Sequence, residues 1–190
     1  DKELILLLTI GREIFNQSFM AYEAGIYYQT RRVYDKAMDQ FILHLTHEPK
    51  QNGIIQRRIL LMSDDEDAVP IVAKKLKTAA QEYPEIILNV LSEFYFKQRE
   101  YTRAFDVKIE LSELRKPDFI DWLKFANECR KENQYEISID AYNFILGFKI
   151  NSNLAGKALL GLAQTFEDQI IPAHESHLIP YFFDNNLFFE

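Results

Sequence analysis

The sequence predicts an all-α protein whose antiparallel helix pairs stack as a right-handed α-solenoid. The 190 residues include only six Gly and six Pro, and this scarcity favours long helices over short strands and tight turns. A tyrosine followed three positions later by a small residue recurs at Tyr34, Tyr101 and Tyr135. Their spacings are 67 and 34 residues, so a weaker copy is expected in between, in residues 65–84. A period near 34 residues is the length of a helix–turn–helix repeat.

Apolar residues at spacings of three and four predict the helices, and polar stretches rich in turn formers predict the breaks between pairs. Asp67 is expected to cap the helix that follows it, with Pro70 in the first turn. The first helices of the pairs are expected at residues 21–32, 54–62, 85–98 and 121–133. Residues 1–17 are predicted to form a helix from a preceding repeat or an N-terminal cap. Four helix pairs are predicted to follow, over 18–51, 53–84, 85–118 and 119–152. Residues 153–190 are predicted to form a partial fifth repeat with an aromatic C-terminal segment.

The recurring small residues predict that the two helices of each pair cross closely, with large aromatic side chains filling the space beside the crossing. These aromatic residues are therefore expected to be core rather than a ligand box. Cys129 is expected to be a buried structural thiol, and Lys108 is expected to lie on the surface. The small residues are Gly25, Ala37, Ser92, Ala104, Ala126 and Ser138, and the large ones are Tyr28, Tyr34, Phe41, Tyr95, Tyr101, Trp122, Tyr135 and Tyr142.

These positions resemble the tetratricopeptide repeat family over roughly residues 18–165. Pro49 and Pro117 are similar to the proline that closes each repeat of the family, and Leu160 with Gly161 looks like the opening of a fifth repeat. The second pair lacks most of the residues typical of the family. The family's turn glycine is replaced by Arg32, Arg99 and Asn133.

The resemblance implies that a ligand would lie against the first helices of the pairs, on a concave and partly apolar face. An exposed apolar stripe usually marks a contact surface. The alternative is that a terminal segment covers it, and residues 177–190 are apolar enough to do so. The family's carboxylate clamp is not expected, because Tyr22, Arg57, Asn89 and Leu123 stand at its positions. The expected groove residues are Phe19, Tyr22, Ile26, Gln29, Ile54, Arg57, Leu61, Ile86, Asn89, Glu93, Phe96, Ile120, Leu123, Asn127 and Arg130.

The residues with catalytic or metal-binding chemistry are few, and each has a structural interpretation beside the chemical one. His44 and His47 either face one metal or belong to a solvated helix end, and the histidines of residues 174–177 have the same spacing. The acidic run 64–67 lacks the pattern of a calcium loop and is expected to sit at the positive end of the next helix. Phosphate-loop, dinucleotide and nucleophile-elbow motifs do not occur in the sequence. We therefore assign no catalytic, cofactor or metal-binding residue.

Charge and hydropathy restrict the partners. The net charge of −7 argues against nucleic acid, which is bound through Lys and Arg. The apolar run of residues 4–8 is far shorter than the roughly 20 residues that span a bilayer, so no membrane insertion is expected. Because the chain begins with Asp, we expect a fragment or a processed form. The single cysteine cannot form an intramolecular disulfide, so cysteine usage does not indicate the cellular compartment.

The predicted function is that of a non-catalytic scaffold that binds a protein or peptide segment in its groove. The alternative is a regulatory or substrate-recruiting domain of an enzyme whose catalytic part lies outside these residues. A helical-repeat nucleic-acid binder is a weaker third hypothesis. Self-association is left open.

Overall fold

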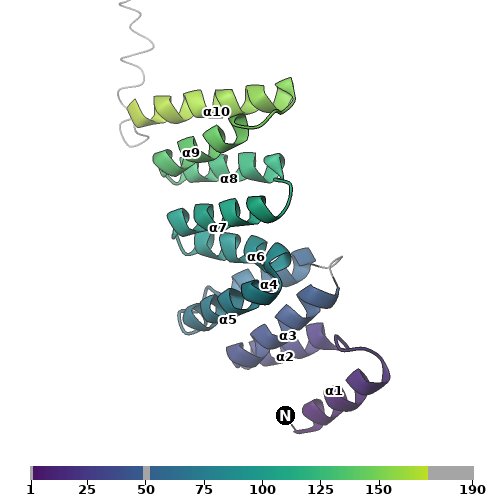
Figure 1. Ribbon diagram of the computed structural model, residues 1–190. Helices are drawn as coiled ribbons and strands as arrows, with labels where there is room; N and C mark the ends of the chain where they lie inside the picture. The colour runs from purple at the N-terminus through teal and green to yellow at the C-terminus, as the bar shows by residue number, and fades with distance from the viewer. Residues whose placement is uncertain (1, 49–51, 171–190) are drawn as a thin grey trace, which may run out of the picture. The chain divides into compact units, whose positions relative to one another are not determined.

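The computed structural model of this chain describes residues 2–48 and 52–170 (Figure 1). All regular secondary structure in these residues is helical, which confirms the predicted all-α class. The packing of consecutive helix pairs is compatible with a helical repeat. The helices are α1 (Lys2–Ile14), α2 (Ala21–Thr30), α3 (Tyr34–His47), α4 (Asn52–Met62), α5 (Val69–Glu82), α6 (Pro84–Lys97), α7 (Tyr101–Leu114), α8 (Phe119–Lys131), α9 (Tyr135–Leu146) and α10 (Ser152–Ile170).

The chain divides into two compact units, and the division falls between Arg115 and Lys116. Unit 1 contains α1 to α7, and unit 2 contains α8 to α10. At this break Arg115 is extended, Pro117 stands two residues later, and Asp118 is the N-cap of the next helix. The carboxylate of Asp118 accepts hydrogen bonds from the backbone N–H groups of Ile120 at 3.0 Å and Asp121 at 3.2 Å, which satisfies two donors at the start of α8.

The close crossings lie where the sequence predicts them. In unit 1, α2 packs along α3 and α6 packs along α7 (Figure 1). A Cβ atom added to Gly25 of α2 would lie 2.4 Å from Cε1 of Phe41 on α3, so only glycine fits there. The Ser92 hydroxyl donates to the Ala104 carbonyl at 2.8 Å, which joins α6 to α7. In unit 2, the Ser138 hydroxyl donates to the Ala126 carbonyl at 2.9 Å and joins α9 to α8.

The large aromatic residues form the core of both units, as predicted. Phe41 and Tyr142 have no exposed surface, and Trp122 is 1% exposed. Tyr135 is the exception, because it is half-buried and its hydroxyl donates to Asn133 Oδ1 at 2.9 Å. Cys129 is fully buried. The other buried members of the set are Tyr28, Tyr34, Tyr95 and Tyr101.

The second helix pair departs from the others. Helices α4 and α5 make few contacts with each other, and α5 packs instead on α6 and α3. Thirty-four residues after Gly25 and Ala37, the two small positions of the first pair, stand Ile59 and Ile71. Ile59 is fully buried and Ile71 is half-buried, so the first pair's two small residues have no small counterparts at this spacing.

Three turns share one backbone geometry. Arg32, Arg99 and Asn133 have φ angles of 57°, 61° and 59°, in the left-handed region that favours glycine. In each turn, the residue after the left-handed one donates its backbone N–H to the carbonyl of the residue five positions before it. In the first turn, the Val33 N–H donates to the Tyr28 carbonyl at 3.0 Å. This bond is typical of the Schellman motif that ends a helix. These are the three positions at which the resembled family has its turn glycine.

We expect Arg99→Gly to stabilise the protein by about 0.5–1 kcal/mol, because a side chain with a Cβ atom is strained in the left-handed region. Arg99 is exposed, so little packing is lost. Asn133→Gly is the matched control, and it should change the free energy of unfolding by only a few tenths of a kcal/mol, since Asn tolerates this conformation. Urea denaturation midpoints measure both. A lower midpoint for Arg99→Gly would contradict the prediction.

Two local predictions are wrong. Asp67 does not cap α5: the residue before the helix is Ala68, no side chain caps it, and the Asp67 N–H donates to Asp65 Oδ1 at 3.1 Å. Pro70 does lie in the first turn. Lys108 is buried, with 6% of its surface exposed, although we expected it on the surface. It follows Ala104 by one helical turn and therefore shares the inward face of α7.

Candidate functional site

Helix α4 carries the most open part of the predicted groove. Ile54 is 55% exposed and Leu61 is 50% exposed, and Arg57 between them is also exposed. Their spacings of three and four residues place them on one outward stripe of the helix. The opposite face, with Ile55 and Ile59, is fully buried. Helix α4 thus presents apolar side chains both to the core and to solvent.

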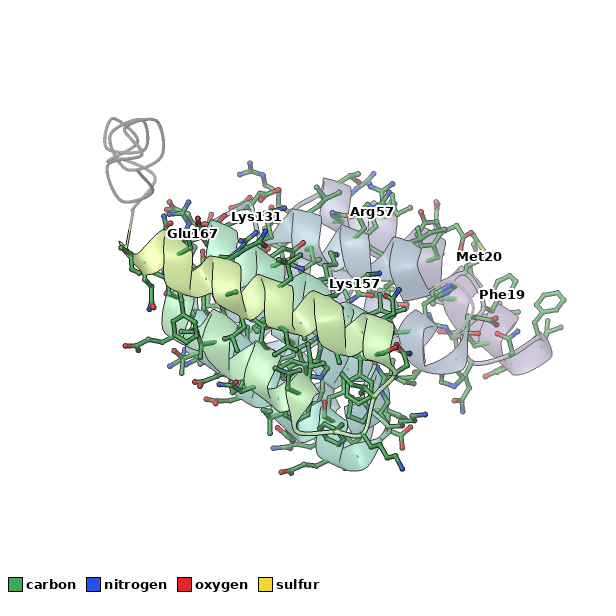
Figure 2. All side chains as sticks on the ribbon, turned by 90° about the horizontal axis from the view of Figure 1, so that it is seen from above. Phe19, Met20, Arg57, Lys131, Lys157 and Glu167 are labelled. Atoms are coloured by element: carbon green, nitrogen blue, oxygen red, sulfur yellow. The ribbon has the colours of Figure 1, made fainter. Side chains whose placement is uncertain are left out.

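The groove residues predicted near α2 are partly used inside unit 1. Tyr22 is half-buried, and its ring lies 5.9 Å from the ring of His44 on α3. Phe19 precedes α2, at the junction that Figure 2 shows together with Met20, and it covers Gly11 of α1. Ile26 and Gln29 are half-buried. These side chains leave only part of their surface for a partner.

The groove residues predicted on helix α6 are also partly exposed and partly buried. Glu93 is exposed, while Ile86 and Asn89 are half-buried. Phe96 is half-buried, and its ring packs edge-on against the core residue Tyr101 with ring centres 5.1 Å apart. Phe96 therefore supports the α6–α7 pair as well as bordering the surface.

The groove residues predicted in unit 2 are mostly engaged within that unit. Leu123 is only 8% exposed, so it is not available to a partner. Asn127 accepts a hydrogen bond from the Tyr142 hydroxyl at 2.8 Å. Arg130 donates to Gln164 on α10 at 3.0 Å and lies 3.6 Å from Asp168. Ile120, by contrast, is 77% exposed at the start of α8.

A hollow of about 670 Å³ opens in unit 1 between the α2–α3 turn and the segment that joins α4 to α5. Gln29 and Leu61 are the two predicted groove residues that line it. Leu61 and Met62 supply apolar surface, and the acidic run 64–67 forms a rim. The sequence interpretation missed this rim as part of a site, because it treated the acidic run only as a partner of the next helix. The remaining lining residues are Thr30, Arg32 and Tyr34.

The acidic run is partly neutralised by its neighbours. The Tyr34 hydroxyl donates to Asp65, and this hydrogen bond holds the pKa of Asp65 below its usual range and raises the pKa of Tyr34. Arg32 lies 3.6 Å from the same carboxylate. Lys97 of α6 lies 2.7 Å from Asp64. Glu66 and Asp67 are exposed on the rim, so the open side of the hollow remains negatively charged.

The two histidines of α3 lie in different surroundings, and only exposed His47, the last residue of the helix, agrees with a solvated helix end. His44 is 7% exposed, so it is not part of a solvated helix end. Exposed His47 makes contacts through both ring nitrogens, Nδ1 with the Leu43 carbonyl at 2.9 Å and Nε2 with Gln17 Oε1 at 3.2 Å. Within residues 2–48 and 52–170, no group of three or more His, Cys, Asp or Glu side chains is placed to hold a metal ion. The histidines of 174–177, and the apolar segment 177–190, lie outside the described residues.

None of the helices that the structure describes is both long enough and apolar enough to cross a bilayer. In comparisons with known proteins, neither a family model nor a curated protein matches this chain. The site is therefore defined by its own geometry: an outward apolar stripe on α4 beside a hollow with an acidic rim.

Proposed function

We propose that this chain is a helical-repeat scaffold of the tetratricopeptide type that binds a peptide or protein segment without catalysing a reaction. The observation that best supports this proposal is the outward stripe of α4, where Ile54 and Leu61 each have half or more of their surface exposed to solvent. Apolar residues grouped in this way on one helix face usually mark a contact site. The repeat type is supported by the glycine-like turns at Arg32, Arg99 and Asn133.

The hollow beside the stripe indicates which partner would fit. Leu61 belongs to both the stripe and the hollow, so one bound segment would contact the two together. The exposed carboxylates of Glu66 and Asp67 attract Lys or Arg, and a complementary charge raises the association rate and orients the partner. We therefore propose an amphipathic segment, with apolar anchors for Ile54 and Leu61 and a basic residue at the rim.

The test is selection of peptides from a random library displayed on phage, followed by affinity measurement by fluorescence polarisation. We expect enriched peptides to combine apolar and basic residues. Ile54→Ser with Leu61→Ser should weaken their binding at least about tenfold, because a few apolar anchors carry most of the energy of such contacts. Tyr22 and Phe96 are less suitable positions, since they also support the fold.

The matched control is Leu159→Ser with Leu160→Ser on α10, where the side chains are 55% and 61% exposed. Circular dichroism and thermal midpoints establish that both double variants remain folded. Selected peptides that bind the α4 variant as tightly as the unchanged protein would place the contact surface elsewhere. An equal loss of peptide affinity in the α4 and α10 double variants would contradict a specific binding site on α4.

A further inference from the structure

The outward face of α10 is mostly apolar and is open to solvent in the part of the chain the structure describes. Ala158, Gly161 and Thr165 form the packed face of this helix. At 100° per residue, the opposite side carries a row of exposed residues, with the charge of Glu167 near its end. Figure 2 looks onto this helix, with Glu167 labelled. The exposed apolar residues of this side are Leu159, Leu160, Ala163, Phe166 and Ile170.

Leu160 occupies a position that is buried in the earlier first helices of the pairs. It precedes Gly161, as Ala24, Leu91 and Phe125 precede the small residues at the crossings of α2, α6 and α8. Those three side chains are at most 6% exposed, whereas Leu160 is 61% exposed. Helices α2, α6 and α8 are each packed along the helix that follows them in the chain, which is α3, α7 or α9. Leu160 therefore lies where the segment that comes after α10 would pack in the same way.

We propose that residues 177–190 of this same chain fold back and cover the outward face of α10. In each earlier pair, the covering segment comes next along the chain after a turn of three residues. Residues 171–190 come next after α10. Pro172 stands two residues beyond this helix, and a proline there cannot continue it. Ile170, the last residue of α10, is 78% exposed on the outward face, so the chain leaves the helix beside the surface to be covered.

The composition and the length of the covering segment fit this face. From Ile170 back to Leu159 the face is about 16 Å long at 1.5 Å per residue, which residues 177–190 can span even when they are helical. The short connection 171–176 holds the segment at an effective concentration on the order of millimolar, so it competes well with a second copy in dilute solution. This contact does not depend on the peptide site proposed on α4. The large apolar residues of the segment include Leu178, Ile179, Phe182, Phe183, Leu187 and Phe188.

Chymotrypsin cleavage of the full chain, followed by intact mass, tests the proposal, because this protease cuts beside large aromatic residues such as Phe182 and Phe183. We expect cleavage within residues 177–190 to be at least about tenfold slower than in a synthetic peptide of the same sequence, because proteolysis follows the population of the open state. Leu160→Glu should restore rapid cleavage. The control Ile120→Glu, at a position 77% exposed on α8, should not. Circular dichroism reports whether each variant is folded.

Other occupants of this face give different results. Rapid cleavage in the unchanged protein would overturn the proposal, and so would protection that survives Leu160→Glu. Protection that increases with protein concentration would indicate a second copy, because a contact within one chain does not depend on concentration. Ile54→Ser with Leu61→Ser should leave the protection unchanged. Release of the segment in that variant would place it on α4 and would also overturn the proposal.

The same contact can be measured from the side of the covering segment. Phe182→Ser with Phe183→Ser should lower the urea denaturation midpoint of the full chain, and so should Leu160→Ser alone. All three substitutions together should lower the midpoint no further than the larger of these two effects, because both remove the same contact. Additive shifts of the midpoint would contradict a contact between the segment and Leu160.

Discussion

Phe41→Ala is expected to lower the free energy of unfolding by about 3–5 kcal/mol, the range found for deleting a buried phenylalanine. Phe41 has no exposed surface and fills the crossing of α2 and α3 beside Gly25. Phe15→Ala is the control, since that ring is 68% exposed, and it should cost about 1 kcal/mol or less. Chemical denaturation followed by circular dichroism measures both. Similar midpoints for the two variants would show that Phe41 does not hold the core together.

Gly25→Ala, at the same contact, is a sharper test. We expect it to lower the stability when Phe41 is present and to raise the stability when Phe41 is replaced by Ala. In the unchanged protein, Gly25→Ala should destabilise by about 1 kcal/mol, since the new Cβ meets the Phe41 ring at 2.4 Å. With Phe41→Ala present, the same substitution should stabilise by about 1 kcal/mol, because alanine is the better helix former. Gly156→Ala on α10, where nothing lies within 4 Å of the added atom, should stabilise in both backgrounds. Additive effects at Gly25 and Phe41 would contradict the contact.

Ala104→Leu is expected to cost about 1–3 kcal/mol through overpacking of the α6–α7 crossing. Ala104 is fully buried, and its carbonyl accepts the Ser92 hydroxyl at 2.8 Å, so the two backbones cannot separate without losing that bond. Thr102→Leu introduces the same side chain at an exposed position of α7 and should stay within about 0.5 kcal/mol. Denaturation midpoints compare the two. A harmless Ala104→Leu would mean that the crossing has room that the structure does not show.

The pairing of consecutive helices was predictable because its signals are local. The spacing of Tyr34, Tyr101 and Tyr135, and the small residues three positions later, follow from how one helix pair packs. The glycine position of Arg32, Arg99 and Asn133 came from the resemblance to the tetratricopeptide repeat family, and all three residues take the left-handed backbone conformation.

The candidate site was less predictable, because burial depends on side chains from distant helices. Leu123 was placed in the groove by helix phase alone, and it is buried by neighbours that phase does not reveal. Arg130 is engaged by Gln164, which lies 34 residues further along the chain, one repeat away. The sequence pattern marks which face of a helix is apolar, but it does not show how much of that face its neighbours cover.

The sequence by itself determined that this protein is helical, that α2 pairs with α3, α6 with α7 and α8 with α9, and which residues are small at those crossings. These features depend on helix propensity and on packing within one pair. Only the tertiary structure decided that α4 and α5 stay apart, that His44 is buried beside Tyr22, and that the acidic run borders a hollow. Each of these depends on the volume and position of residues that meet across helices.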